Sequence, residues 1–319
     1  MTPTLTRRGL ALGAATLLTA PALATPALAQ AAPVLRIGNQ KGGLRSLVEA
    51  SGVAKDLPYR IEWSEFPAAA PLLEALNAGA LDLGYQGDLA FLTVAASGAP
   101  LRGIGIARHS PAGQGILVRD DAIRSIADLR GKRIAGNRGG WGHYLIRAAL
   151  KQAGIAPDAV TINFLPPTDA LLAFRSGAVD AWAIWEPYIS VEVQQFGART
   201  LLDGRGLTPS IMFVSAHEQA IRDKRPQLAD FLRRFAAGWD WARGHIPDYA
   251  RYNSELTRIP EAALRRAYEI EATAAAPLDE AVLREFQHAA DQAVEFGLLR
   301  DRVDVRRTVE LGVAPAVGG

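Results

Sequence analysis

A pattern that repeats after about 98 residues is the feature that most constrains how this chain folds. Residues 36–43, Arg-Ile-Gly-Asn-Gln-Lys-Gly-Gly, are similar to residues 133–140, Arg-Ile-Ala-Gly-Asn-Arg-Gly-Gly. The further matches are residues 66–73 with 165–172 and residues 79–82 with 177–180. Self-similarity at a fixed spacing indicates repeated structural units. Two units of similar plan therefore follow one another.

Each unit alternates short apolar runs with helical patterns, which is typical of parallel strands joined by crossover helices. The expected strands are 34–38, 60–65, 81–85, 101–107, 132–135, 160–164, 181–184 and 211–215. The expected helices between them are 44–53, 71–78, 88–96, 140–153, 168–175 and 187–195. After residue 217, a period of 3.6 predicts helices over 227–243, 261–271 and 279–296. The fold class is therefore α/β, with two tandem lobes and a helical C-terminal segment.

The two units predict two lobes around a cleft. Lobe I is expected to comprise residues 30–116 plus 214–319, and lobe II residues 117–213. The apolar segments 115–118 and 211–214 are expected to cross between the lobes.

The N-terminus has the pattern of an export signal. Arg7 and Arg8 precede an apolar stretch, and Ala27-Leu28-Ala29 supplies a small-x-small cleavage site. The paired arginines favour a twin-arginine (Tat) signal peptide over residues 1–29, cleaved near Ala29. Because the chain has no cysteine, we expect no lipid anchor and a product free in the periplasm.

Composition excludes several classes of function. The absence of cysteine rules out disulfides, thiolate nucleophiles and Cys-ligated zinc. A formal net charge of +2 does not argue for nucleic-acid binding. No apolar run of the length needed to span a membrane follows the signal segment.

Two glycine turns are the candidate binding elements. Gly42-Gly43 and Gly139-Gly140 each follow the first strand of a unit, where ligands of open parallel sheets bind. The helix that follows begins there, and its first N–H groups have no partner within the helix, so they attract anions. The adjoining residues Gln40, Lys41, Asn137 and Arg138 belong to the same candidate site. We expect the two turns to face each other across the cleft and to hold an anion.

A second matching pair ends the third strand of each unit. Gly87-Asp88 aligns with Trp185-Glu186, and each acid stands where a helix begins. Two interpretations stay open: both acids only cap their helices, or one faces the cleft and accepts a hydrogen bond from the ligand.

Aromatic residues gather at the same loops. They are Tyr85, Trp141, Trp185 and Tyr188. Trp141 directly follows a glycine pair, so we place it in the cleft, since ligand pockets are mostly apolar. Trp239 and Trp241 lie in a helical run and are interpreted as packing residues.

Several segments together resemble the periplasmic binding proteins of aliphatic-sulfonate ABC transporters. They are Gln40-Lys41-Gly42, residues 63–67, residues 73–79, Gly87-Asp88 and Trp185-Glu186-Pro187-Tyr188. The resemblance covers essentially the whole mature chain and extends to taurine- and nitrate-binding proteins. It implies a type II periplasmic-binding-protein fold, in which two Rossmann-like lobes close on a ligand at a hinge. It also implies an ABC permease and ATPase as partners, and a monomer without a cofactor.

The chain departs from this family at the second glycine turn. Relatives usually have Lys-Gly-Ser-Ser where this chain has Arg138-Gly139-Gly140-Trp141, while His143 agrees with the family. The loss of two hydroxyl donors and the gain of an indole favour a larger organosulfonate, aromatic or zwitterionic, over taurine. Glu186 stands where relatives commonly have Asp. His143 is interpreted either as a ligand contact or as a packing residue. Arg108 is interpreted either as a ligand contact or as a solvated hinge residue.

A cleft between two lobes is compatible with three classes of function. A periplasmic receptor that captures an organosulfonate is the main hypothesis. A receptor for nitrate, taurine or another small anion, and a ligand-sensing domain, are alternatives with the same cleft. An enzyme such as a sulfur-compound hydrolase is disfavoured, because the sequence has no Gly-x-Ser-x-Gly or His-Glu-x-x-His motif and its enzymatic relatives depend on cysteine. We therefore expect no catalytic and no metal-binding residues.

Overall fold

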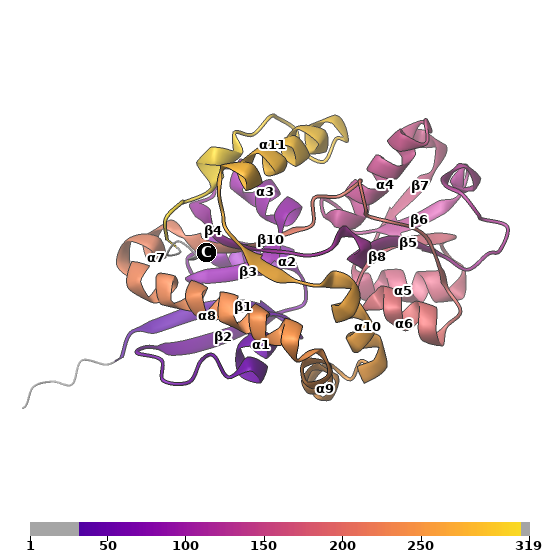
Figure 1. Cartoon of the computed structure of the whole chain (residues 1–319). Helices are drawn as coiled ribbons and strands as arrows, with labels where there is room; N and C mark the ends of the chain where they lie inside the picture. Colours follow the sequence, from indigo (N-terminus) through magenta and orange to yellow (C-terminus); the bar gives the residue numbers. More distant parts are fainter. Residues whose placement is uncertain (1–31, 314–319) are drawn as a thin grey trace, which may run out of the picture. The chain divides into compact units, whose positions relative to one another are not determined.

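The chain forms two separate β-sheets, each flanked by helices (Figure 1). The structure is a computed structural model that describes residues 32–313, so the predicted signal peptide lies outside the described residues. The six-stranded sheet has the order β11 (Ala274–Ala276), β4 (Leu101–Arg108), β10 (Ile211–His217), β3 (Leu83–Gly87), β1 (Val34–Gln40) and β2 (Arg60–Phe66). The five-stranded sheet has the order β7 (Thr161–Phe164), β6 (Arg133–Gly136), β8 (Ala181–Trp185), β5 (Gln114–Val118) and β9 (Arg199–Asp203). We call the sheets, with their helices, lobe I and lobe II.

Most helices belong to lobe I. They are α1 (Leu44–Ser51), α2 (Ala69–Asn77), α3 (Asp88–Ala96), α7 (Glu218–Asp223), α8 (Arg225–Gly244), α9 (Ile246–Thr257), α10 (Glu261–Glu271) and α11 (Glu280–Glu295). Lobe II has α4 (Trp141–Gln152), α5 (Pro167–Ser176) and α6 (Tyr188–Gln195). The short 3-10 turns are η1 (Pro111–Gly113), η2 (Ile126–Leu129), η3 (Pro157–Ala159) and η4 (Val305–Thr308). Among residues 32–313, no helix has both the length and the hydropathy needed to cross a membrane.

The repeat predicted from the sequence is a structural repeat. In lobe I, β1 pairs in parallel with β2 and β3, and in lobe II β6 pairs in parallel with β7 and β8. Each lobe then adds one antiparallel strand from outside its three parallel strands: β10 pairs with β3 in lobe I, and β5 pairs with β8 in lobe II. The predicted α/β fold with two tandem lobes is confirmed.

The crossing segments differ from the expectation. Residues 115–118 lie inside β5 of lobe II, and residues 211–214 lie inside β10 of lobe I. The chain instead passes between the sheets over residues 109–113 and 204–210. Continuous apolar runs are typical of strands buried on both faces, and both β5 and β10 are such strands, with neighbours on each side. The polar, glycine-containing segments beside them make the connections.

The same ion pair ties the first strand of each repeat to the third. In lobe I, Asp82 accepts hydrogen bonds from the backbone N–H and the guanidinium of Arg36, both at 2.7 Å. In lobe II, Asp180 accepts from the backbone N–H of Arg133 at 2.8 Å and from its guanidinium at 3.1 Å. Lys224 adds a 2.7 Å contact to Asp82 alone. The lobe I copy is therefore the more buried and the more strongly bonded of the two.

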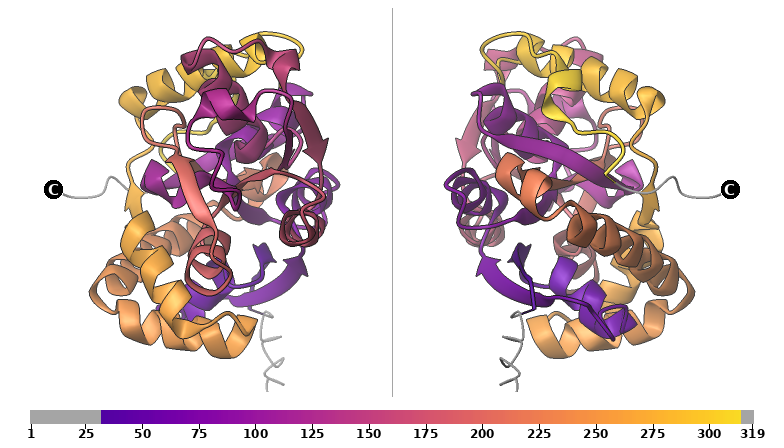
Figure 2. Two further views of the ribbon diagram at one scale, coloured as in Figure 1. Left: turned by 90° about the vertical axis from the view of Figure 1, so that its right-hand side faces the viewer. Right: turned by 90° about the vertical axis from the view of Figure 1, so that its left-hand side faces the viewer.

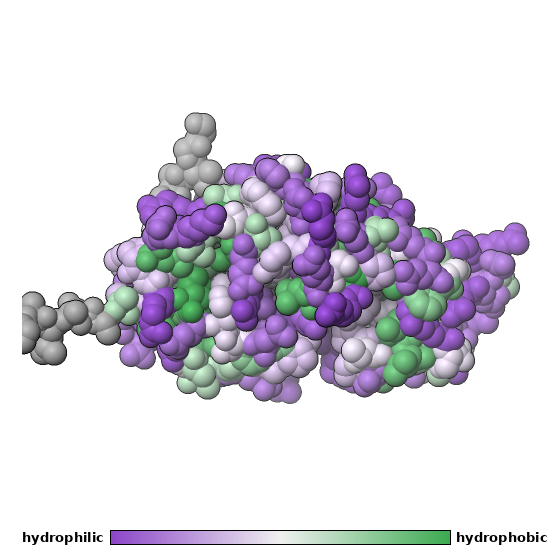
Figure 3. All heavy atoms as spheres, turned by 90° about the horizontal axis from the view of Figure 1, so that it is seen from below, coloured by the Kyte–Doolittle hydropathy of each residue, from purple (hydrophilic) through white to green (hydrophobic). Residues whose placement is uncertain are grey.

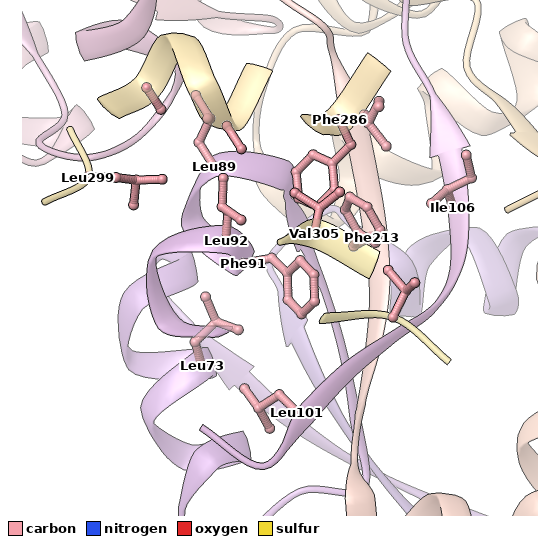
Figure 4. Close-up of a cluster of buried hydrophobic side chains, with 14 of the residues drawn as sticks. Leu73, Leu89, Phe91, Leu92, Leu101, Ile106, Phe213, Phe286, Leu299 and Val305 are labelled. Carbon is pink, nitrogen blue, oxygen red and sulfur yellow. The ribbon is translucent and has the colours of Figure 1, made fainter. Parts of the chain in front are cut away.

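A stack of phenylalanines forms the centre of one lobe I core (Figure 4). Phe213 of β10 lies 4.8 Å from Phe91 of α3 and 4.8 Å from Phe286 of α11, measured between ring centroids. This stack brings the C-terminal helix α11 back onto the N-terminal part of lobe I, as expected for a helical tail. Buried aromatic pairs of this kind stabilise a core beyond the burial of their area.

The helices α1 and α8 cover the other face of the lobe I sheet, and α9 and α10 pack beside them (Figure 2). α8 and α9 pack on α1, and α10 contacts both α9 and α6 of lobe II. The surface seen in Figure 3 is mostly hydrophilic, with separate small groups of hydrophobic residues. Several elements were not predicted, among them β9, the three-alanine strand β11, α7 and α9.

We predict that Asp82→Asn lowers the free energy of unfolding more than Asp180→Asn does. Asp82 is 2% exposed and loses a bond to each of two cations, whereas Asp180 is 26% exposed and screened by water. The expected costs are about 1–3 kcal/mol for Asp82 and about 1 kcal/mol or less for Asp180, measured by urea unfolding at neutral pH. Equal costs would show that the two copies of the pair are energetically equivalent.

Candidate functional site

Asp88 joins the two lobes and the chain segment between them. Its Oδ1 accepts hydrogen bonds from the N–H of Leu89, at 2.7 Å, and from Nε1 of Trp141 in lobe II, at 2.5 Å. Its Oδ2 accepts from the N–H of Ile211, the first residue of β10 after the connection from lobe II, at 3.1 Å. Burial raises the pKa of Asp88 to about 6, although these three donors oppose that rise. The side chain thus caps α3 and also holds a residue of the opposite lobe.

Trp141 lies against the start of α3. Its indole is so close to Gly87 that a Cβ atom there would lie 3.3 Å from the ring. Trp141 is the first residue of α4, directly after the turn Gly139-Gly140. The N-terminus of α4 in lobe II therefore meets the N-terminus of α3 in lobe I, and the predicted residues Gly87, Asp88, Gly140 and Trp141 come together.

A row of aromatic rings runs from lobe I to lobe II. Tyr85 on β3 and His109 at the connection both lie 6.5 Å from Trp239 on α8. His109 is 6.1 Å from Trp141, which is 6.5 Å from Trp185 at the end of β8. Most neighbouring rings meet edge to face, so the row is well packed. Trp185 was predicted for the site, and the structure places it beside Trp141.

Several polar atoms in this region are buried and have no hydrogen-bond partner among residues 32–313. They are the hydroxyl of Tyr85, Nε1 of Trp239, Nε2 of His109 and Oε1 of Glu186. A buried polar atom without a partner is costly, and a bound ligand is one way to satisfy it. The row of rings is therefore the strongest candidate for a binding surface in the described part of the chain.

Two further acids lie at the connection between the lobes. Glu186 is 3% exposed, and its Oε2 accepts from the N–H of Ser190 in α6 at 2.9 Å. Glu271, the last residue of α10, lies 3.8 Å from Nδ1 of His109. Burial raises the pKa of Glu186, and burial together with the charge of Glu186 raises the pKa of Glu271 to about 8. Glu186 therefore caps a helix, as one of the two interpretations predicted, while one of its oxygens remains unused.

The two glycine turns have the same local structure. Gly42 and Gly139 both adopt left-handed backbone, with φ of 75° and 68°, which favours glycine. Before each turn an asparagine accepts a hydrogen bond from one N–H of the helix that follows the turn: Asn39 accepts from Arg45 at 2.9 Å, and Asn137 from Gly142 at 3.0 Å. Each asparagine satisfies only one of the four N–H groups that begin a helix. Asn137 is thus a capping residue.

The structure places the two turns in different surroundings. The first turn lies against α9, because a Cβ on Gly42 would lie 2.9 Å from Thr257. The second turn lies near α3, because Trp141, which follows it, contacts Gly87. Gln40 ends β1, and its carbonyl accepts from the N–H of Gly43 at 2.8 Å. That Gly42 and Gly139 face each other across a ligand stays a prediction.

The predicted basic residues do not gather at the row of rings. Lys41 and Arg138 are exposed, and the guanidinium of Arg138 lies 3.9 Å from the ring centroid of Phe164 in lobe II. Arg108 makes two hydrogen bonds to Glu285 of α11, at 3.1 and 2.6 Å. The edge of the His143 ring meets Phe164, and burial lowers the pKa of His143 to about 4, so it is neutral. Packing and ion pairing thus account for the observed positions of Arg138, Arg108 and His143.

Three residues of this region were not predicted as site residues: Trp239, His109 and Glu271. Trp239 packs on the lobe I core, as interpreted, but its indole N–H also points into the buried region described above. Tyr85 was noted only as one of the loop aromatics. Tyr188, another of them, packs 5.5 Å from Trp182 inside lobe II.

A cavity lies away from the row of rings. It has a volume of about 490 Å³ and lies between α4 of lobe II and α11 of lobe I. Two contacts bridge the lobes next to it: the hydroxyl of Tyr144 bonds to Gln292, and Lys151 pairs with Glu295 at 2.7 Å. Glu285, the partner of Arg108, lines this cavity. It is the main competitor as a ligand site.

Comparisons with known proteins agree with this architecture. Residues 65–250 match the NMT1/THI5-like family. An Escherichia coli (strain K12) protein named for binding aliphatic sulfonates is 32% identical over 86% of this chain and 88% of its own length.

Two solved structures of sulfonate-binding proteins resemble the whole described fold. The alkanesulfonate-binding protein SsuA from Xanthomonas axonopodis pv. citri, bound to MOPS, is 31% identical, with a TM-score of 0.82, and covers 89% of this chain and 100% of its own. The periplasmic aliphatic sulphonate binding protein SsuA from Escherichia coli is 32% identical, with a TM-score of 0.80, and covers 87% of this chain and 97% of its own. Both the matched family and these relatives extend over both lobes. The chain therefore belongs to the NMT1/THI5-like family and has the two-lobed, type II periplasmic-binding-protein fold.

Proposed function

We propose that this protein is the substrate-binding receptor of an ABC importer and captures an organosulfonate between its two lobes. The observation that carries the proposal is the hydrogen bond from Trp141 of lobe II to Asp88 of lobe I, within a row of rings that spans both lobes. Relatives that cover both lobes are named for binding sulfonates, and one of them was solved with MOPS, a sulfonate.

The sulfonate group is held mainly by N–H donors. The start of α4 brings helix N–H groups next to the start of α3, and helix N-termini bind anions through these groups and through the helix dipole. The two glycine turns complete the proposed anion site, with Gln40, Gly42 and Gly43 from the first turn and Gly139 from the second. Lys41 and Arg138 act at longer range, because both side chains are exposed.

The organic part of the ligand packs on the aromatic row. Trp141 and Trp185 supply two indole surfaces on lobe II, and Tyr85 and Trp239 supply two rings on lobe I. Large rings contribute more apolar contact than a small, fully hydrogen-bonded ligand such as taurine can use. The site thus suits alkyl or aryl sulfonates with a substantial organic group.

The cellular setting follows from the same proposal. We infer export by the Tat route, cleavage near Ala29 and a periplasmic, non-lipidated receptor that works with a membrane permease and an ATPase. We further propose two lobes that close about the connections at residues 109–113 and 204–210, and a monomer that binds without changing its ligand. The absence of cysteine is consistent with a receptor rather than a thiol-dependent enzyme.

Ligand screening by thermal unfolding tests the substrate class. Alkyl and aryl sulfonates are expected to raise the melting temperature, because a ligand at 100 times its Kd adds about 2.7 kcal/mol to the stability of the folded state. Sulfate esters, nitrate, taurine and bicarbonate are expected to give smaller shifts. A large shift with nitrate or bicarbonate and none with any sulfonate would contradict the substrate assignment.

A second prediction concerns Trp141. Trp141→Phe keeps an aromatic ring but removes the N–H that reaches Asp88, so the closed form loses a hydrogen bond to a charged group. We expect this to weaken sulfonate binding by about 1.5–3 kcal/mol, which is roughly tenfold to a hundredfold in Kd, by titration calorimetry. Trp241→Phe is the matched control, because Trp241 stacks on His245 on the far side of α8. Equal affinities of the two variants would show that the contact between the lobes does not contribute to capture.

Incubation with ligands separates capture from catalysis. The purified protein is expected to return every sulfonate unchanged, as judged by mass spectrometry and a sulfite assay. Release of sulfite at a rate that depends on protein concentration would establish an enzyme instead.

A further inference from the structure

Two buried carboxyl groups lie near each other at the connection between the lobes, and among residues 32–313 neither forms an ion pair with a lysine or an arginine. Glu186 and Glu271 both adjoin Gly113: the N–H of Glu186 donates to the Gly113 carbonyl at 2.9 Å, and a Cβ on Gly113 would lie 2.9 Å from Cγ of Glu271. They come from opposite sides, Glu186 from the end of β8 in lobe II and Glu271 from the end of α10. The two acids therefore meet at the segment that connects the lobes.

The groups around Glu271 leave its charge unbalanced. Nδ1 of His109 lies 3.8 Å from the carboxylate of Glu271. Burial lowers the pKa of His109 to about 4, so the ring is neutral and does not balance that carboxylate. Nδ1 of His109 also lies 2.7 Å from the hydroxyl of Thr273. The phenols of Tyr85, Tyr249 and Tyr268 stay protonated, because burial raises the pKa of each. Arg266 acts on Glu186 from the exposed side of α10.

Aromatic rings and unused polar atoms surround the pair. Tyr85 is 7% exposed, its hydroxyl has no partner among residues 32–313, and the charge of Glu271 contributes to the raised pKa of this phenol. The indole of Trp239 lies 6.5 Å from both Tyr85 and His109. Carboxylates close to aromatic rings bind ammonium groups, through charge and cation–π attraction. The unused Oε1 of Glu186 is a further acceptor at the same place.

We propose that Glu271 and Glu186, with the rings of Tyr85 and Trp239, form a subsite for a cationic group. The inference rests on the proposed sulfonate receptor and narrows its ligands to zwitterionic sulfonates that are larger than taurine and carry an ammonium group. The sulfonate lies at the starts of α3 and α4, and the ammonium group lies at the connection between the lobes. When Glu271 is deprotonated, the negative charge of the two acids also disfavours simple anions such as nitrate, which offer nothing to balance it.

Two ligands of equal shape test this subsite. The first is 3-(trimethylammonio)propane-1-sulfonate, and the second is 4,4-dimethylpentane-1-sulfonate, in which carbon replaces the charged nitrogen. The wild-type protein is expected to bind the ammonium compound at least about tenfold more tightly, by titration calorimetry. Equal affinities, or a preference for the carbon compound, would overturn the subsite while leaving a sulfonate receptor. Binding of neither compound, nor of any other sulfonate, would instead contradict the proposed function.

Variants locate the preference. Glu271→Gln and Glu186→Gln are each expected to reduce the preference for the ammonium compound to within about threefold, because each removes one negative charge without changing size. Glu261→Gln, at the exposed first turn of the same helix α10, is the matched control and is expected to keep the full preference. A preference that survives both site variants would overturn the assignment. Circular dichroism identifies any variant that fails to fold, and the other site variant then decides the outcome.

The affinity for the ammonium compound is also expected to depend on pH. Glu271 has a pKa of about 8 in the unliganded protein, so at lower pH it must lose a proton before it can balance a cation. Neither ligand titrates in this range, so the ratio of the two affinities should rise from pH 6 to pH 8 and then level off. In the Glu271→Gln variant, the part of this rise that comes from deprotonation of Glu271 should be absent. A constant ratio in the wild-type protein would show that Glu271 does not meet the cation.

Discussion

A buried carboxylate with donors from three parts of the chain is the interaction on which the arrangement of the lobes depends. Asp88 accepts from its own helix, from the first residue of β10 and from Trp141 in the opposite lobe. If one donor is lost, a buried charge is left with fewer partners, which costs more than an exposed hydrogen bond. The contact therefore links the start of α3, the connection between the lobes and the start of α4.

The two halves of the molecule share a plan but have diverged at the ends of their third strands. Both use an Arg–Asp pair between the first and third strands, and both use an asparagine to cap the helix after a glycine turn. In lobe I the third strand ends in Gly87-Asp88, where the absence of a side chain admits Trp141. In lobe II it ends in Trp185-Glu186, which supplies a ring and a second buried acid. The shared parts maintain the fold, and the diverged parts make the two sides of the cleft chemically different.

The sequence predicted the architecture well because the repeat carries its own contacts. The alignment of Arg36 with Arg133, and of Asp82 with Asp180, places matching residues at matching points of two sheets. Periodicity could not predict β11, which consists of three alanines, or assign residues 115–118 and 211–214 to sheet interiors. A run of apolar residues looks the same in a crossing segment and in a central strand until its partners are known.

The site was harder to predict than the fold. Residues close to the repeated turns, such as Trp141 and Asp88, could be predicted for the candidate site because the repeat marks where ligands of open sheets bind. Trp239 and Glu271 come from α8 and α10, which lie outside the repeat, and only the packing of these helices brings them to the row of rings. Arg108 and Arg138 look like counter-ions in the sequence, but the fold gives each a partner of its own.

Anomalous diffraction from a crystal grown with a bound sulfonate tests the central claim most directly. The chain has two methionines and no cysteine, so the ligand's sulfur gives one of very few peaks, and Met212 serves as the internal reference. The account predicts a peak at the starts of α3 and α4, beside Trp141 and Asp88. A peak in the cavity between α4 and α11, or on an outer face of either lobe, would contradict it.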